Sequence, residues 1–212
     1  MPSLPARIDA LFARLLDPRC PRCGVATRLT GFCEGCRRDL AAWPAPPPGA
    51  ADPGPVLAAI AWGPASAPLL RRYKFHGDLA CGLALADLAL PALRGAARPE
   101  LVVPVPLHQR RLRDRGYDQA GLLAATWARA LGIPLGRDAL RRTRDSRPQT
   151  RLSSRERRRN LVGAFEACSA MPPSVALVDD VLTTGSTVRA AADALREAGA
   201  HEVQVWVVAR AP

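Results

Sequence analysis

Short apolar runs alternate with helical patterns along the second half of the chain. The runs Leu101–Val105 and Val175–Val178 have the length of buried strands, and Val203–Val208 places valine at alternate positions. Apolar residues recur with helical spacing across Tyr117–Leu131 and Ser186–Ala198, and a glycine ends each pattern. This order of elements predicts an α/β domain with a mostly parallel twisted sheet flanked by helices. Ligands of such sheets bind outside the carboxyl ends of the strands.

The start of the chain has the spacing of an amphipathic helix. Its apolar residues share one helical face: Leu4, Ile8, Leu11, Leu15 and Leu16. Charged residues are spread among them, so the segment lacks the apolar region of a signal peptide. No stretch approaches the ~20 apolar residues that span a bilayer. We therefore expect a cytoplasmic protein with no membrane insertion.

The cysteines form a cluster with the spacing of metal ligands. Four of the six cysteines make two Cys-x-x-Cys pairs with nine residues between them: Cys20, Cys23, Cys33 and Cys36. Four sulfur ligands are the tetrahedral set that Zn²⁺ prefers, and they leave no position for catalytic water, so the predicted zinc is structural. Reduced buried thiols or redox-active thiols are the alternative. We expect Cys81 and Cys168, which lie apart from the cluster, to be small core residues.

A proline-rich segment divides the chain. Residues 44–55 are rich in proline, which predicts a stiff linker. We expect a helix plus a four-cysteine zinc module over 1–43, the linker over 44–55 and the α/β domain over 56–212.

The segment Val175–Val188 carries the most chemical information. A buried strand is followed by Asp179 and Asp180, whose carboxylates can accept hydrogen bonds from vicinal hydroxyls. A loop of hydroxyl and glycine residues comes next and leads into a helix: Thr183, Thr184, Gly185, Ser186 and Thr187. Backbone N–H groups and the helix N-terminus favour a phosphate at this loop. We expect a sugar phosphate to bind here. The alternative interpretation of the same residues is a capped helix beside two surface acids.

This segment resembles the signature of the type I phosphoribosyltransferases, which bind 5-phosphoribosyl-1-diphosphate (PRPP). The resemblance implies that Asp179 and Asp180 hold the ribose hydroxyls and Mg²⁺, and that Thr183–Thr187 hold the 5-phosphate. A narrower resemblance, to the ComF competence-protein family, extends over nearly the whole chain. It rests on Tyr73–Asp78, Val103–Ala120, Gln149 with Leu152–Phe165, and an N-terminal cysteine module.

The first of two basic stretches follows the strand Leu101–Val105 and contains four arginines, at positions 110, 111, 113 and 115. In the enzymes that this chain resembles, the corresponding loop binds diphosphate, whose oxygens suit the guanidinium fork. Family position makes Arg110 and Arg111 the expected contacts.

The second basic stretch, Arg141–Arg159, has nine arginines against two acids. It is open to three interpretations: a mobile loop that closes over the site, a groove for the nucleic-acid backbone, or a solvated basic loop. The residues that we assign to the first two roles are Arg141, Arg142, Arg144, Arg147, Arg151, Arg155 and Arg157.

The formal net charge of +11 is consistent with a polyanionic ligand. Resemblance to the ComF family implies a PRPP-binding protein that handles incoming single-stranded DNA in natural transformation, with a helicase as a possible partner. The alternative is an active phosphoribosyltransferase of nucleotide metabolism, which would release diphosphate from PRPP with Mg²⁺ and transfer the sugar to an unidentified acceptor. The 6-oxopurine enzymes carry an acid where this chain has Thr183, so salvage of those bases is less expected.

Overall fold

The central element is a parallel sheet of four strands in the order β1–β6–β5–β2. The computed structural model describes residues 18–27, 31–47, 49, 52–143 and 163–211. The strands are β1 (Val56–Ala61), β2 (Leu101–Pro104), β5 (Ser174–Leu182) and β6 (Glu202–Arg210). All three pairings between neighbours are parallel. The predicted sheet is confirmed.

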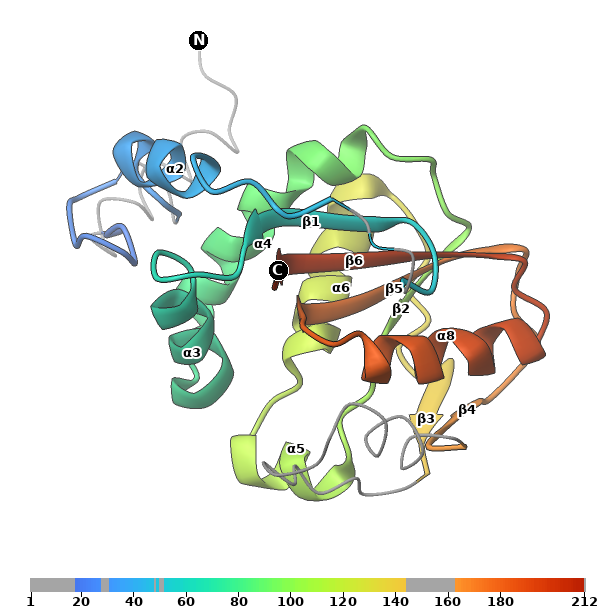
Figure 1. The fold of residues 1–212 in the computed structure, drawn as a ribbon. Helices are drawn as coiled ribbons and strands as arrows, with labels where there is room; N and C mark the ends of the chain where they lie inside the picture. The colour runs from blue at the N-terminus through green and yellow to red at the C-terminus, as the bar shows by residue number, and fades with distance from the viewer. Residues whose placement is uncertain (1–17, 28–30, 48, 50–51, 144–162, 212) are drawn as a thin grey trace, which may run out of the picture.

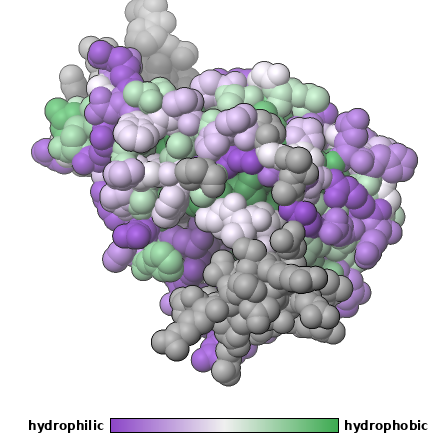
Figure 2. Space-filling view, viewed as in Figure 1, coloured by the Kyte–Doolittle hydropathy of each residue, from purple (hydrophilic) through white to green (hydrophobic). Residues whose placement is uncertain are grey.

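Helices cover both faces of this sheet (Figure 1). On one face lie α4 (Leu79–Arg94) and α6 (Gln119–Leu131), and on the other lies α8 (Ser186–Glu197). The alternation of side chains along each strand divides the core accordingly: Val178 and Trp206 pack with α4 and α6, whereas Leu177 and Val205 pack with α8. Figure 2 shows that hydrophilic residues cover the outer side of α8. The predicted α/β architecture with flanking helices is therefore confirmed.

Strand β6 lies in the middle of the sheet although it ends the chain. Every residue from Val203 to Arg210 is buried, because β1 and β5 pair with its two edges and helices cover its two faces. Strand β5 is longer than the apolar run predicts and continues through Asp179 and Asp180 to Leu182. Pairing with β6 extends to this end, since Leu182 lies opposite Arg210.

Smaller elements lie around the sheet and its helices. They are α3 (Ala67–His76), α5 (Gln109–Arg115) and an antiparallel pair, β3 (Leu140–Arg142) with β4 (Phe165–Ala167). Helix α3 lies close against α4, because the ring of Tyr73 occupies the space above Gly82, where a Cβ atom would come within 2.2 Å of the ring. The hydroxyl of Tyr73 donates a hydrogen bond to the Gln119 carbonyl over 2.8 Å, which joins α3 to α6.

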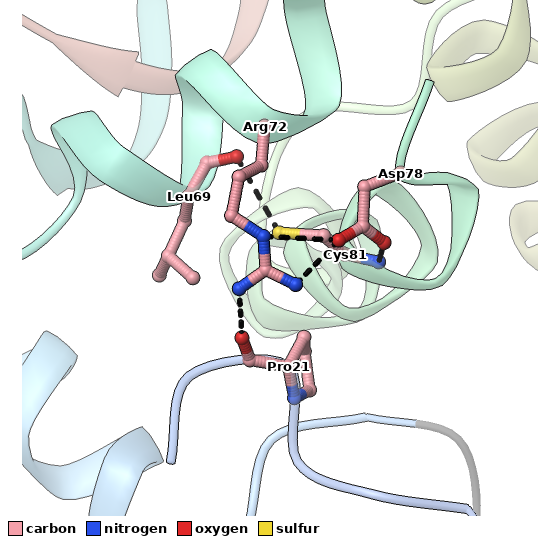
Figure 3. Close-up of polar contacts among 5 residues, drawn as sticks. All are labelled: Pro21, Leu69, Arg72, Asp78 and Cys81. Carbon is pink, nitrogen blue, oxygen red and sulfur yellow. Dashed lines mark hydrogen bonds and ion pairs between the residues drawn. The ribbon is translucent and has the colours of Figure 1, made fainter. Parts of the chain in front are cut away.

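The cysteine-containing segment packs against the α/β domain. Its helix α2 (Glu34–Ala41) buries Cys36 and Leu40 in the same apolar cluster as α4. The side chain of Arg72 on α3 donates to the Pro21 carbonyl and to Asp78, which caps α4 (Figure 3). Arg37 forms a further ion pair with Asp87 of α4.

Described residues of the predicted linker also contact the domain. Asp52 forms a 2.7 Å ion pair with Arg210 at the end of β6, and both side chains are nearly buried. Cys81 is fully buried, as predicted, and its thiol contacts the Leu69 carbonyl. The prediction for Cys168 is wrong: it follows β4 and is exposed. The helix predicted over the first 16 residues lies outside the described residues. In the part of the chain that the structure describes, no helix has the length and apolarity needed to cross a bilayer.

Candidate functional site

The four predicted metal ligands lie together. The Sγ atoms of Cys20, Cys23, Cys33 and Cys36 are all within 4.8 Å of one another, and those of Cys23 and Cys33 are 3.7 Å apart. Zn–S bonds of ~2.3 Å in a tetrahedron separate the sulfurs by about 3.8 Å, so the cluster has nearly the size of a zinc site. The four cysteines could therefore hold zinc.

The ionisation of these thiols also fits a bound cation. Burial opposes ionisation of Cys20, but hydrogen bonds from the N–H groups of Cys33, Cys23 and Arg22 lower its pKa to about 6. Burial and the neighbouring thiols raise the pKa of Cys36 to about 12. Four thiolates cannot share this space without a positive ion, and zinc would supply that charge.

The acid pair lies where the sheet opens at its carboxyl end. Strand β2 pairs with β5 as far as Pro104 opposite Val178, and the N–H of Val105 still donates to the Val178 carbonyl over 2.8 Å. Strand β5 then continues alone on this side, so Asp179 and Asp180 extend beyond the end of β2. A cavity of about 240 Å³ opens there, and both carboxylates line it.

A lysine contacts one of the two acids. Lys74 Nζ lies 2.9 Å from Asp180 Oδ2 and 3.0 Å from Oδ1. The Asp180 side chain is 5% exposed, so its negative charge is compensated at close range. Lys74 is the only lysine in the sequence, and all the other residues in the Lys+Arg count are arginines.

The second acid, Asp179, is half-buried and next to a like charge. Burial and the proximity of Asp180 raise the pKa of Asp179 to about 7. Its Oδ1 accepts a 2.8 Å hydrogen bond from the N–H of Asp180. The two carboxylates thus differ in environment, and a cation near Asp179 would favour its ionised form.

The predicted phosphate loop forms the adjoining edge of the cavity. Thr183 and Thr187 line the cavity with the acids, and a second hollow of about 50 Å³ lies against Thr183–Thr187. Gly185 caps α8 with a left-handed backbone (φ 69°), which a residue with a side chain rarely adopts. The hydroxyls of Thr184 and Ser186 are 3.2 Å apart. The loop therefore gathers hydroxyls and the N-terminus of α8 around one small space.

The structure separates the two arginines expected to contact diphosphate. Both belong to α5, but Arg111 lines the cavity, whereas Arg110 is exposed and is absent from its lining. Three further arginines line it, from α3, α5 and β3: Arg71, Arg115 and Arg142. With Lys74, five basic side chains face the acid pair and the loop.

The described start of the second basic stretch lies beside this cavity. Thr143 N donates to the Ala164 carbonyl over 2.9 Å, which joins the chain before and after residues 144–162. Arg142 lines the cavity and lies over the Phe165 ring, whereas Arg141 forms a 2.9 Å ion pair with exposed Glu166. The other arginines assigned to this stretch lie outside the described residues: Arg144, Arg147, Arg151, Arg155 and Arg157.

Sequence reasoning did not assign a role to Lys74 or Arg71. Both belong to α3, whose predicted importance rested on resemblance alone. One signal was present in the composition, since a chain this rich in arginine has a single lysine.

Comparisons with known proteins agree with the fold and point to one family. A phosphoribosyl transferase domain model matches residues 122–212, which include β5, the loop and α8. The chain is 40% identical to "Competence protein F" of Haemophilus influenzae over 153 residues, 68% of this chain and 67% of the relative. It is 35% identical to "DNA utilization protein YhgH" of Escherichia coli over 199 residues, 90% of this chain and 83% of the relative. "Competence protein ComFC" of Streptococcus pneumoniae is 26% identical over 203 residues, 95% of this chain and 85% of the relative. The chain therefore belongs to the ComF competence-protein family, on a phosphoribosyltransferase-type fold.

Proposed function

We propose that this protein binds PRPP with Mg²⁺ at the carboxyl end of β5. The observation that carries the proposal is the lining of one cavity, where Asp179, Asp180 and the phosphate loop face five basic side chains. PRPP has matching parts: vicinal ribose hydroxyls, a 5-phosphate monoester and a diphosphate. In this assignment, the two carboxylates accept the hydroxyls and Thr183–Thr187 hold the 5-phosphate.

The basic side chains would bind the diphosphate. Arg111 of α5 and Arg142 of β3 both line the cavity, and guanidinium forks bind phosphate oxygens in pairs. Asp179 and Asp180 would help to hold Mg²⁺, whose charge would support the ionised form of Asp179 and neutralise the diphosphate leaving group. If the protein turns PRPP over, these same contacts stabilise charge as diphosphate departs from C1.

Fragments of PRPP test this assignment. Ribose 5-phosphate and diphosphate, each with Mg²⁺, should bind weakly and compete with PRPP for the same site, because each occupies part of it. Thermal denaturation at increasing ligand concentration measures both affinities. If neither fragment competes with PRPP, then PRPP binds outside this cavity and the assignment is wrong.

We further propose that the protein handles single-stranded DNA in the cytoplasm during natural transformation, with a helicase as a candidate partner. Support comes from the relatives, whose names refer to competence and DNA utilization, and from the net charge of +11. The arginines of the second basic stretch are the proposed contacts to DNA phosphates. Binding of a labelled oligonucleotide should weaken steeply as salt rises, with a slope that reports the number of phosphates neutralised. Salt-independent binding would contradict this role.

A phosphoribosyltransferase with an unidentified acceptor is the second candidate. Its support is the intact acid pair beside the phosphate loop, which a protein acting on DNA alone does not need. Release of diphosphate from PRPP that is lost in Asp179→Asn would favour this candidate.

A further inference from the structure

A buried glutamine lies beside the ion pair between Lys74 and Asp180. Gln119 is the first residue of α6, lines the cavity together with these two residues and is 2% exposed. A glutamine at such a position loses its contacts with water, so its amide needs hydrogen-bond partners within the protein. Neither the proposed assignment of PRPP nor the packing of α6 against the sheet accounts for an amide at this position.

The amide of Gln119 is hydrogen-bonded to the backbone of α3. Its Nε2 donates to the Lys74 carbonyl over 3.1 Å. That carbonyl is one of the last four of α3, which has no N–H group of its own to offer them. The N–H of Asp78, which would reach Lys74 in a longer helix, donates to the Arg72 carbonyl instead. The side chain of Gln119 therefore replaces the missing helical hydrogen bond at Lys74.

A second hydrogen bond joins the same two helices. The hydroxyl of Tyr73 donates to the Gln119 carbonyl over 2.8 Å, and the Gln119 side chain donates back to the next residue of α3. Backbone and side chain of Gln119 thus contact two consecutive residues of α3. This reciprocal pair fixes both the position and the rotation of the last turn of α3 relative to α6.

The last turn of α3 has little other support. Its buried side chains end at Tyr73, and both Phe75 and His76 are exposed. A lysine carries its charge on a flexible stem, so the place of its amine depends on how its backbone is held. The amine of Lys74 nevertheless lies 2.9 Å from Asp180 Oδ2 and 3.0 Å from Oδ1.

We propose that Gln119 is a positioning residue, which holds the backbone of Lys74 so that the lysine amine remains in contact with Asp180. Gln119 acts through Lys74, and Lys74 in turn compensates the charge of the nearly buried Asp180. The consequence for PRPP rests on the proposed function. A displaced Lys74 leaves Asp180 uncompensated, and its charge then opposes binding of a polyanionic ligand.

The first experiment follows Lys74 without any ligand. Because Lys74 is the only lysine, protein made with ¹³C-labelled lysine gives the NMR signals of this one side chain. In the wild type, its ε-methylene group should be ordered by the contact with Asp180. Gln119→Met keeps the length of the side chain but cannot donate a hydrogen bond. In this variant, the order parameter of the ε-methylene group should fall to that of a solvent-exposed lysine.

Two further variants separate positioning from a general loss of stability. Gln204 is also a buried glutamine, its Nε2 donates to the Ala97 carbonyl over 2.9 Å, and it lies outside the cavity. Gln204→Met should lower Tm but leave the Lys74 signals unchanged. Gln119→Asn keeps the amide and is one carbon too short to reach the Lys74 carbonyl. It should release Lys74 as Gln119→Met does, and it provides the test if Gln119→Met does not fold.

The second experiment measures affinity for Mg²⁺-PRPP by calorimetry. Gln119→Met should weaken binding about fivefold, within the range of coupling between residues in contact. Because Gln119 acts through Lys74, adding Gln119→Met to Lys74→Met should cause no further loss. Gln204→Met should bind as the wild type does. Additive losses in the double variant would indicate a direct contact between Gln119 and the ligand, and would contradict action through Lys74.

The two experiments distinguish failure of this inference from failure of the proposed function. Lys74 signals that are unchanged in both Gln119→Met and Gln119→Asn, or a Lys74 side chain that is already mobile in the wild type, would overturn the positioning role, whether or not PRPP binds. A wild type that does not bind Mg²⁺-PRPP, but in which Gln119 keeps Lys74 ordered, would contradict the proposed function and support the positioning role.

Discussion

Lys74 Nζ lies 2.9 Å from Asp180 Oδ2, in the wall of the cavity where β5 extends beyond β2. These residues are far apart in the sequence and meet because α3 packs against α4 and α6. A lysine gives a compact charge on a flexible stem, unlike the planar fork of arginine. Any ligand of Asp180 must therefore share or replace this contact.

Replacement of Lys74 should weaken PRPP binding. In Lys74→Met the nearly buried Asp180 loses its compensating charge and repels the polyanionic ligand, and we expect affinity to fall about tenfold. Lys74→Arg restores the charge but not the shape, so it should recover part of the loss. Calorimetric titration of Mg²⁺-PRPP measures both. Unchanged or tighter binding in Lys74→Met would mean that the ion pair is irrelevant to the site.

The raised pKa of Asp179 predicts a pH-dependent effect on stability. The pKa is about 7 in the folded protein, against an ordinary value of 3.8. The folded state therefore keeps a proton that the unfolded chain releases, and this contribution to stability is complete below pH ~4 and lost as pH rises through about 7.

Asparagine resembles the protonated form of Asp179, so Asp179→Asn should be the more stable protein at pH 8. We expect a gain of about 2 kcal/mol in unfolding free energy, or ~5 °C in Tm, and a smaller gain at pH 5. Thermal denaturation at the two pH values checks this prediction. Asp193→Asn, on the exposed side of α8, is the control and should show no such dependence on pH. An Asp179→Asn protein that is less stable at pH 8 would contradict the raised pKa.

The two neighbouring arginines of α5 form a matched pair of variants. Arg111 lines the cavity and Arg110 does not. Arg111→Ala should reduce affinity for PRPP and for diphosphate about tenfold, because a charge-assisted contact to phosphate oxygens is lost. Arg110→Ala should change neither. Equal losses in the two variants would indicate a general effect of charge rather than a contact in the cavity.

Removal of the predicted zinc should affect both stability and the distant cavity. Cys36→Ser removes one of four ligands, so we expect the metal content to fall from one zinc per chain toward zero, and Tm to fall by at least several degrees. Affinity for PRPP should also decrease, because Arg72 ties the Pro21 carbonyl to α3, the helix that carries Lys74. Cys168→Ser is the control, since that cysteine is exposed and outside the cluster. Metal analysis and calorimetry follow both effects. Full zinc content in Cys36→Ser would contradict the four-sulfur site.

The sequence predicts helices and strands best where the hydrophobic pattern of a segment matches the face that the segment buries in the fold. The apolar run Val175–Val178 and the helix Ser186–Ala198 correspond to β5 and α8, which are confirmed. Two elements had no usable pattern. Helix α4 is almost entirely apolar, so it lacks the polar face that marks helical periodicity, and half of the residues of β1 are alanine, which has little preference for strands.

The composition of the cavity could not be derived from local sequence. Whether Arg110 or Arg111 faces the acids depends on the rotation of α5 about its axis, and both are in the same basic stretch. The contact between Lys74 and Asp180 joins residues 106 positions apart. The length of β5 was underestimated because Asp179 and Asp180 resemble a strand end, yet pairing with β6 continues past them.

The central claim is that Asp179 and Asp180 form part of a PRPP site, and calorimetric titration of Mg²⁺-PRPP into the zinc-loaded protein tests it most directly. The wild type should show saturable binding with about one site per chain, and the Asp179→Asn, Asp180→Asn double variant should lose it while keeping its folded structure by circular dichroism. Absence of binding in the wild type, or equal affinity in the double variant, would contradict the account.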